Sequence, residues 1–148
     1  MEGRVLKQGG FTALELVATV GLIAIIAGIA VSNLKEMSNP LANASVSMEH
    51  FLRLARARAI ANTEAIKIAP QSATRIVAFT SDSCSGTMTP LADLSLDLPP
   101  GSSLNETVWT VCYSQRGLAD NNIFFRLIDL DGQMKTVHVA LGGGTKID

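Results

Sequence analysis

Glu15 is the residue whose type and position most clearly require an explanation, because it is a carboxylate at the start of an apolar run. Residues 16–31 read LVATVGLIAIIAGIAV without a charge, and the next charged residue is Lys35. A helix over residues 16–34 would be about 28 Å long, close to the ~30 Å hydrocarbon core of a bilayer. An unpaired carboxylate costs about 2.5–3.5 kcal/mol at the bilayer centre and less toward the interface. If this segment crosses a membrane, Glu15 needs a partner.

Two ordinary interpretations of the apolar run leave something unexplained. A secretory signal peptide has a short apolar core followed by a small-residue cleavage site. Here the run is longer, and IAVSNLKEM leads directly into charged residues without a persuasive A-x-A site. A plain single-span anchor fits the hydropathy equally well, but it gives Glu15 no role.

The run Gly10-Phe11-Thr12-Ala13-Leu14-Glu15, after the basic stretch MEGRVLKQGG, resembles the processing site of type IV prepilins. The resemblance implies that a prepilin peptidase in the membrane cuts between Gly10 and Phe11 and that the new Phe11 terminus is N-methylated. Residues 1–10 would then be a leader. The motif is specific because it needs a basic leader, Gly-Phe, a glutamate at a fixed offset and an apolar span in that order.

The same resemblance suggests how Glu15 finds its partner. Arg4 and Lys7 would hold the leader on the cytoplasmic side and place the rest of the chain outside. We expect Glu15 of one subunit to receive the Phe11 amine of a neighbour, which would set the axial register of a helical filament. Breaking a buried ion pair costs about 3–5 kcal/mol.

The composition excludes several other classes of protein. The 148 residues carry 12 basic and 13 acidic side chains, and only 17% are charged against 47% apolar. A disordered acidic tail would carry more charge, and a protein that binds nucleic acid by neutralising phosphates would be basic. Loss of the leader removes Glu2, Arg4 and Lys7 and makes the remaining chain slightly more acidic. The length suits one domain.

Helical periodicity continues beyond the apolar run, over residues 35–65. Apolar residues form one stripe with Phe51 at its edge, and Glu49, Arg53, Arg56 and Glu64 lie opposite. The members of the stripe are Leu34, Met37, Leu41, Ala44, Met48, Leu52, Ala55 and Ala59. Pro40 predicts a kink or short break near Ser38–Pro40. The stripe could form a coiled-coil seam, but its small alanines favour packing against a sheet.

From Ile66 onward the period changes to that of strands. The segments AIKIA, TRIVAFTS, ADLSLDL, ETVWTVCYS, NIFFRLIDL and MKTVHVAL are short and separated by turn residues. The clearest hairpin turns at Asp131-Gly132, where we expect a tight primed turn. The predicted fold class is α+β: a long N-terminal helix, transmembrane over residues 11–34, followed by one globular domain. In that domain residues 35–65 pack against an antiparallel β head of residues 66–148.

The C-terminal half resembles the GspH/FimT group, the minor pseudopilins of type II secretion and minor pilins of type IV pili. The features that carry this resemblance are the turn at 113–117, the strand with Phe125 and Leu127, the Asp131-Gly132 turn and the final glycine run. It implies a pilin-like structural subunit that assembles into a filament or primes its tip. Its partners would be other pilins, the prepilin peptidase and an inner-membrane assembly platform. The chain would sit in the bacterial inner membrane with its head in the periplasm, then in the filament.

Cys84 and Cys112 would lie outside the cytoplasm, where a disulfide is the leading expectation and two buried thiols the alternative. Closing that loop would stabilise the fold by about 3–4 kcal/mol. A zinc site is not expected, because neither cysteine belongs to a CxxC motif and the histidines, His50 and His138, lie far apart in the sequence.

Motifs for enzyme chemistry are missing from the sequence. Asp129 and Asp131 fit a hairpin turn better than a pair of acid and base carboxylates or a calcium loop. We do not expect Gly142–Gly144 to be a phosphate loop, because no helix can form in the four residues given after it. There is no G-x-S-x-G, Walker or zincin motif, so we expect neither an enzyme nor a cofactor or metal.

The alternative function is DNA capture during natural transformation, as in the FimT-like pilins. These use basic residues of the C-terminal region, where this chain has only Lys135 and Lys146 beside Asp148. Arg53, Arg56 and Arg58 form the strongest basic cluster, but packing or solvation explains them on a helix. We therefore do not expect nucleic acid to be a partner.

Overall fold

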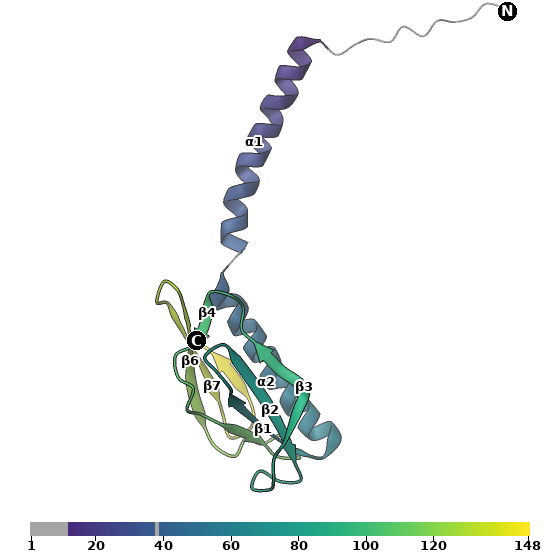
Figure 1. Cartoon of the computed structure of the whole chain (residues 1–148), viewed down its shortest axis with the longest axis vertical. Helices are drawn as coiled ribbons and strands as arrows, with labels where there is room; N and C mark the ends of the chain where they lie inside the picture. Colours follow the sequence, from purple (N-terminus) through teal and green to yellow (C-terminus); the bar gives the residue numbers. More distant parts are fainter. Residues whose placement is uncertain (1–11, 38) are drawn as a thin grey trace, which may run out of the picture. The chain divides into compact units, whose positions relative to one another are not determined.

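The computed structural model describes residues 12–37 and 39–148, which fall into two compact units, Met1–Ser38 and Asn39–Asp148. The first unit holds helix α1 (Ala13–Met37), and the second holds helix α2 (Pro40–Asn62) and the strands (Figure 1). The strands are β1 (Ala65–Pro70), β2 (Arg75–Ser81), β3 (Thr89–Asp97), β4 (Ser102–Leu104), β5 (Val111–Tyr113), β6 (Ile123–Asp129), β7 (Met134–Val139) and β8 (Thr145–Ile147). This is the α+β class expected from the sequence.

The helical part breaks where Pro40 predicted, since α1 ends at Met37 and α2 begins at Pro40. Pro40 suits the first position of a helix because its missing N–H would have no partner there. The preceding Asn39 is extended, with ψ at 98°, and its side-chain oxygen accepts the N–H of Ala42 at 2.9 Å. Such an N-cap satisfies one of the free donors at a helix start. Ser38 lies outside the described residues.

One face of α2 is buried against strands of both sheets, which confirms packing against a sheet instead of a coiled-coil seam (Figure 1). The buried residues are Leu41, Ala44, Ser45, Met48, Phe51, Leu52, Ala55 and Ala59. Ser45 was not expected there, but its hydroxyl donates to the carbonyl of Leu41 at 2.7 Å and so keeps a partner. The side chains of Leu34 and Met37 lie outside the described part of the structure.

The strands form two antiparallel sheets where the sequence suggested one. Their orders are β3-β2-β1-β5 and β4-β6-β7-β8. Ile66, Ile68 and Ile76 enter the core from the first sheet, and Phe125 and Val137 enter it from the second. Helix α2 therefore joins the two sheets through one shared core.

The segment 106–110 is not a strand, although its sequence predicted one. Only Val111–Tyr113 pair in the sheet, as β5. The Trp109 indole donates to the carbonyl of Glu106 at 3.1 Å, and its ring stacks on Phe125 with centroids 4.0 Å apart. These contacts accompany an irregular backbone over residues 106–110. Strands β4 and β8 were not expected from the sequence.

The hairpin between β6 and β7 is confirmed, but its turn differs from the predicted one. Asp129 and Gln133 enclose a loop of three residues, in which only Gly132 has a positive φ, at 78°. The Asp129 carboxylate accepts the N–H groups of Asp131 and Gln133 at 3.0 and 2.8 Å. Those bonds favour an ordinary turn followed by a glycine bulge over a two-residue primed turn.

Within the described residues, none of the helices combines the length and apolarity that crossing a membrane requires. The crossing expected for residues 11–34 is not confirmed.

Candidate functional site

The first turn of α1 holds the one residue of the expected processing and assembly site that the structure describes. Gly10 and Phe11 lie outside the described residues, whereas Glu15 follows Thr12 at the start of the helix. The Glu15 Oε2 atom accepts both the backbone N–H and the hydroxyl of Thr12, each at 3.2 Å. In return, the Thr12 hydroxyl oxygen accepts the Glu15 N–H at 3.3 Å. This reciprocal arrangement is a capping box.

Glu15 thus has a partner within its own helix, which the sequence argument did not foresee. The signal was present as Thr12-x-x-Glu15 directly before an apolar run. A negative charge is also favourable in the first turn, where backbone N–H groups point outward. Within the described residues, both side-chain bonds use Oε2 and none uses Oε1.

The side chains of α1 that are described form an apolar surface around the whole helix. Leu14 is 82% exposed and Val17 71% exposed. The other exposed large apolar residues of this stretch are Leu16, Val20, Leu22, Ile23, Ile25 and Ile26. At 100° per residue these positions point in every direction around the axis. A helix that is apolar on all sides is typical of a protein core or a membrane.

In the head, Cys84 and Cys112 form a disulfide, as favoured from the sequence, with Cα atoms 5.8 Å apart. Cys112 lies on β5 and is buried, while Cys84 lies in the loop between β2 and β3. The bond therefore ties a surface loop to the edge strand of the first sheet. Both cysteines are occupied, so neither is a free nucleophile.

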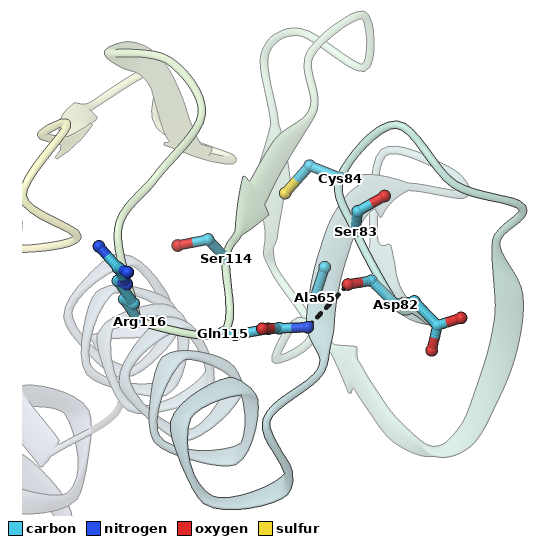
Figure 2. Close-up of a pocket in the computed structure, with 7 residues that line it drawn as sticks. All are labelled: Ala65, Asp82, Ser83, Cys84, Ser114, Gln115 and Arg116. Atoms are coloured by element: carbon cyan, nitrogen blue, oxygen red, sulfur yellow. Dashed lines mark hydrogen bonds between the residues drawn. The ribbon is translucent and has the colours of Figure 1, made fainter.

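A cavity of about 300 Å³ lies beside this disulfide (Figure 2). Its lining residues are Ala65, Asp82, Ser83, Cys84, Ser114, Gln115 and Arg116. The Gln115 amide donates to the backbone carbonyl of Asp82 at 2.9 Å and so links the two loops that enclose the cavity. This lining contains no histidine and no free thiol, and it does not form a nucleophile and base pair.

The two histidines lie on separate surfaces. His50 is exposed on α2. His138 is exposed on β7, with its Nε2 atom 3.9 Å from the Asp148 carboxylate. A hydrogen bond from Lys146 lowers the pKa of Asp148 below its ordinary value. Among the described residues, no group of three or more metal-binding side chains comes together.

The arginines of α2 do not form one basic surface, because each has a different partner. Arg53 pairs with Glu49 at 2.6 Å, and Arg58 pairs with Asp93 at 2.6 Å. The hydrogen bond from Arg58 holds the pKa of Asp93 below its ordinary value. The third, Arg56, donates from Nε to the carbonyl of Gly117 at 3.0 Å.

Comparison with solved structures shows the same fold in pilin-type proteins. The type IV minor pilin FimU of Pseudomonas aeruginosa superimposes with a TM-score of 0.59 at 16% identity, over 74% of this chain and 89% of that one. The chain has a GspH/FimT-like minor pilin fold. The minor pseudopilin EpsH from the type 2 secretion system of Vibrio cholerae gives a TM-score of 0.55 at 12% identity, over 72% of this chain and 96% of that one.

No protein-family model and no curated protein matches the sequence. At these identities the similarity to solved structures concerns the minor pilin fold alone. The expectation of a GspH/FimT-like head, which rested on turns and strands in residues 113–148, is confirmed at that level.

Proposed function

We propose that this protein is a minor pilin or minor pseudopilin, a structural subunit of a type IV pilus or a type II secretion pseudopilus. It assembles into the filament or primes its tip, and it is not an enzyme. The observation that carries the proposal is the combination, in one chain, of a minor pilin head with a helix whose apolar side chains are exposed on all sides. Such a helix needs lipid or other subunits to cover it.

In this proposal the chain begins in the bacterial inner membrane with its head in the periplasm. A prepilin peptidase cuts between Gly10 and Phe11, the Phe11 amine is methylated, and an assembly platform draws the subunit into the filament. The GFTALE motif and the apolar surface of α1 support this sequence of events.

Glu15 has two roles in the proposal. Its Oε2 atom holds the helix start through Thr12, which fixes where the carboxylate lies. Its Oε1 atom then receives the Phe11 amine of a neighbouring subunit. A carboxylate that is already oriented loses less side-chain entropy when it forms an ion pair.

Incorporation of variants into filaments tests the proposal. In the native host, we expect Glu15→Ala and Glu15→Gln to be processed and retained in the membrane but to fall by about tenfold or more in the sheared filament fraction. Thr19→Val is the matched control, because among the described residues its hydroxyl bonds within the same helix, to the carbonyl of Leu16 at 3.0 Å. Wild-type levels of Glu15→Ala in filaments would contradict the assembly role.

DNA capture ranks second because the basic cluster of α2 is divided among intramolecular partners. Arg53 and Arg58 are neutralised by Glu49 and Asp93. Lys146 is paired with Asp148 at 2.6 Å. We expect no gel retardation of DNA by the protein even at low ionic strength, where phosphate contacts are strongest.

A further inference from the structure

A groove separate from α1 and from the disulfide lies between α2 and the turn that joins β7 to β8. It has a volume of about 470 Å³. Arg53, Arg56, Ala57 and Ile60 line it from the helix, and residues 143–145 line it from the other side. Neither the disulfide nor the capping box of Thr12 and Glu15 uses these residues.

Arg56 is held in this groove by two glycine turns. Its Nε atom donates to the Gly117 carbonyl, and its side chain lies against both Gly117 and Gly143. A Cβ atom would lie 3.1 Å from Nε if added at Gly117 and 2.9 Å from it if added at Gly143. Both glycines have a positive φ, at 72° and 75°. The backbone can approach the arginine this closely only because these positions lack a side chain.

This packing leaves one end of the Arg56 guanidinium available. Its Nε atom is used by Gly117, and within the described residues its terminal nitrogens make no hydrogen bond or ion pair. These two nitrogens present parallel N–H groups, the geometry that accepts a planar carboxylate at two points. Their direction is fixed before any ligand arrives.

We propose that this groove binds a single carboxylate, supplied by an acidic side chain of a neighbouring pilin subunit. Arg56 would hold it at two points, and the Thr145 hydroxyl would donate a further bond. The identity of the donor as a pilin subunit rests on the proposed function. A nucleic acid is a poorer fit, because a polyanion needs several free cations and Arg53 already pairs with Glu49.

The test is an NMR titration of the ¹⁵N-labelled full chain in detergent micelles with sodium acetate, using sodium chloride at matched ionic strength as the reference. We expect saturable shifts of the Arg56 Nε–H and of the Gly144 and Thr145 amides with acetate. Arg56→Gln should weaken acetate binding about tenfold, and Arg56→Lys should lose most of the same affinity because it lacks the planar fork. Arg53→Gln, on the same helix face, should change it less than about twofold.

The proposal is overturned if acetate shifts these signals no more than chloride does, or if Arg56→Gln binds acetate as the wild type does. Tighter binding of a DNA oligonucleotide than of acetate at this groove would overturn the assigned ligand class. The titration uses unassembled protein, so its failure leaves the filament proposal standing. Absence of the wild-type protein from filaments would refute the filament role without affecting acetate binding.

Discussion

The two helices have similar lengths, 25 and 23 residues, but opposite relations to solvent. Along α1 the described apolar side chains are exposed, as at Leu22 with 62%. Along α2 they form one stripe that two sheets cover, and Leu52 is fully buried. Helix α2 buries its apolar stripe inside the chain, whereas the described apolar side chains of α1 stay exposed. In the proposed function, lipid or other subunits cover them. Stability should therefore depend on α2 and assembly on α1.

The largest expected effect comes from truncating the buried stripe. Leu52→Ala should lower the free energy of unfolding of the head by about 2–5 kcal/mol, because it leaves a cavity where α2 meets the sheets. Leu22→Ala in α1 should change the free energy of unfolding by less than about 0.5 kcal/mol, because that side chain is exposed and its loss leaves no cavity. Denaturant unfolding of the full chain in detergent, followed by Trp109 fluorescence, measures both.

Leu54→Ala is a second control on the same helix as Leu52, since its side chain is 47% exposed. This variant should lower the free energy of unfolding by no more than about 1 kcal/mol. Equal losses for the Leu22 and Leu52 variants would break the distinction between the two helices.

The disulfide should have the next largest effect, and only on the head. Its cysteines are 28 residues apart. A Cys84→Ser, Cys112→Ser double variant should lose about 3 kcal/mol of stability, because the unfolded chain regains the freedom that the bond removed. Reduction of the wild type with a thiol should shift the denaturation midpoint to the same value. An unchanged midpoint would show that the bond does not constrain the head.

Gly143→Ala should cost about 2–3 kcal/mol, because the new Cβ clashes with the Gly117 carbonyl oxygen and meets the side chain of Arg56 at a positive φ. Gly142→Ala is the matched control, since a Cβ there meets nothing within 4 Å. Thermal unfolding of the two variants compares them directly. If both melt alike, the turn does not hold Arg56 in the way described.

The smallest effect concerns the ion pair between α2 and β3. The hydrogen bond from Arg58 lowers the pKa of Asp93 below its ordinary 3.8. The pair therefore stabilises the fold above that pH, and its contribution is lost as the pH falls through the lowered pKa. Arg58→Gln should lower the urea midpoint slightly at neutral pH and leave it unchanged near about pH 2. A difference that grows on acidification would contradict this account.

The sequence predicted features that depend on local chemistry. Pro40 and its neighbours located the helix break, the spacing of Met48, Leu52 and Ala55 identified the buried face, and Asp131-Gly132 located a hairpin. Features that depend on contacts between distant residues were missed. Trp109 lies in a segment whose local propensity favours a strand, but the segment forms no strand and the ring stacks on Phe125 instead.

For the candidate sites too, local features could be predicted from the sequence and contacts between distant residues could not. Glu15 was singled out because a carboxylate in an apolar run is costly, and the capping box with Thr12 could have been read from the same residues. The groove of Arg56 could not have been read from the sequence. Gly117, Gly143 and Thr145 are far from Arg56 along the chain, and only the fold brings them close to it. Charge spacing along α2 instead suggested one cluster of three arginines.

Intact mass and N-terminal sequencing of the protein extracted from its native membrane test the central claim most directly. The account predicts a chain that begins at N-methylated Phe11 and lacks residues 1–10. An intact Met1, or a cut beyond residue 31 that removes the apolar run, would contradict it.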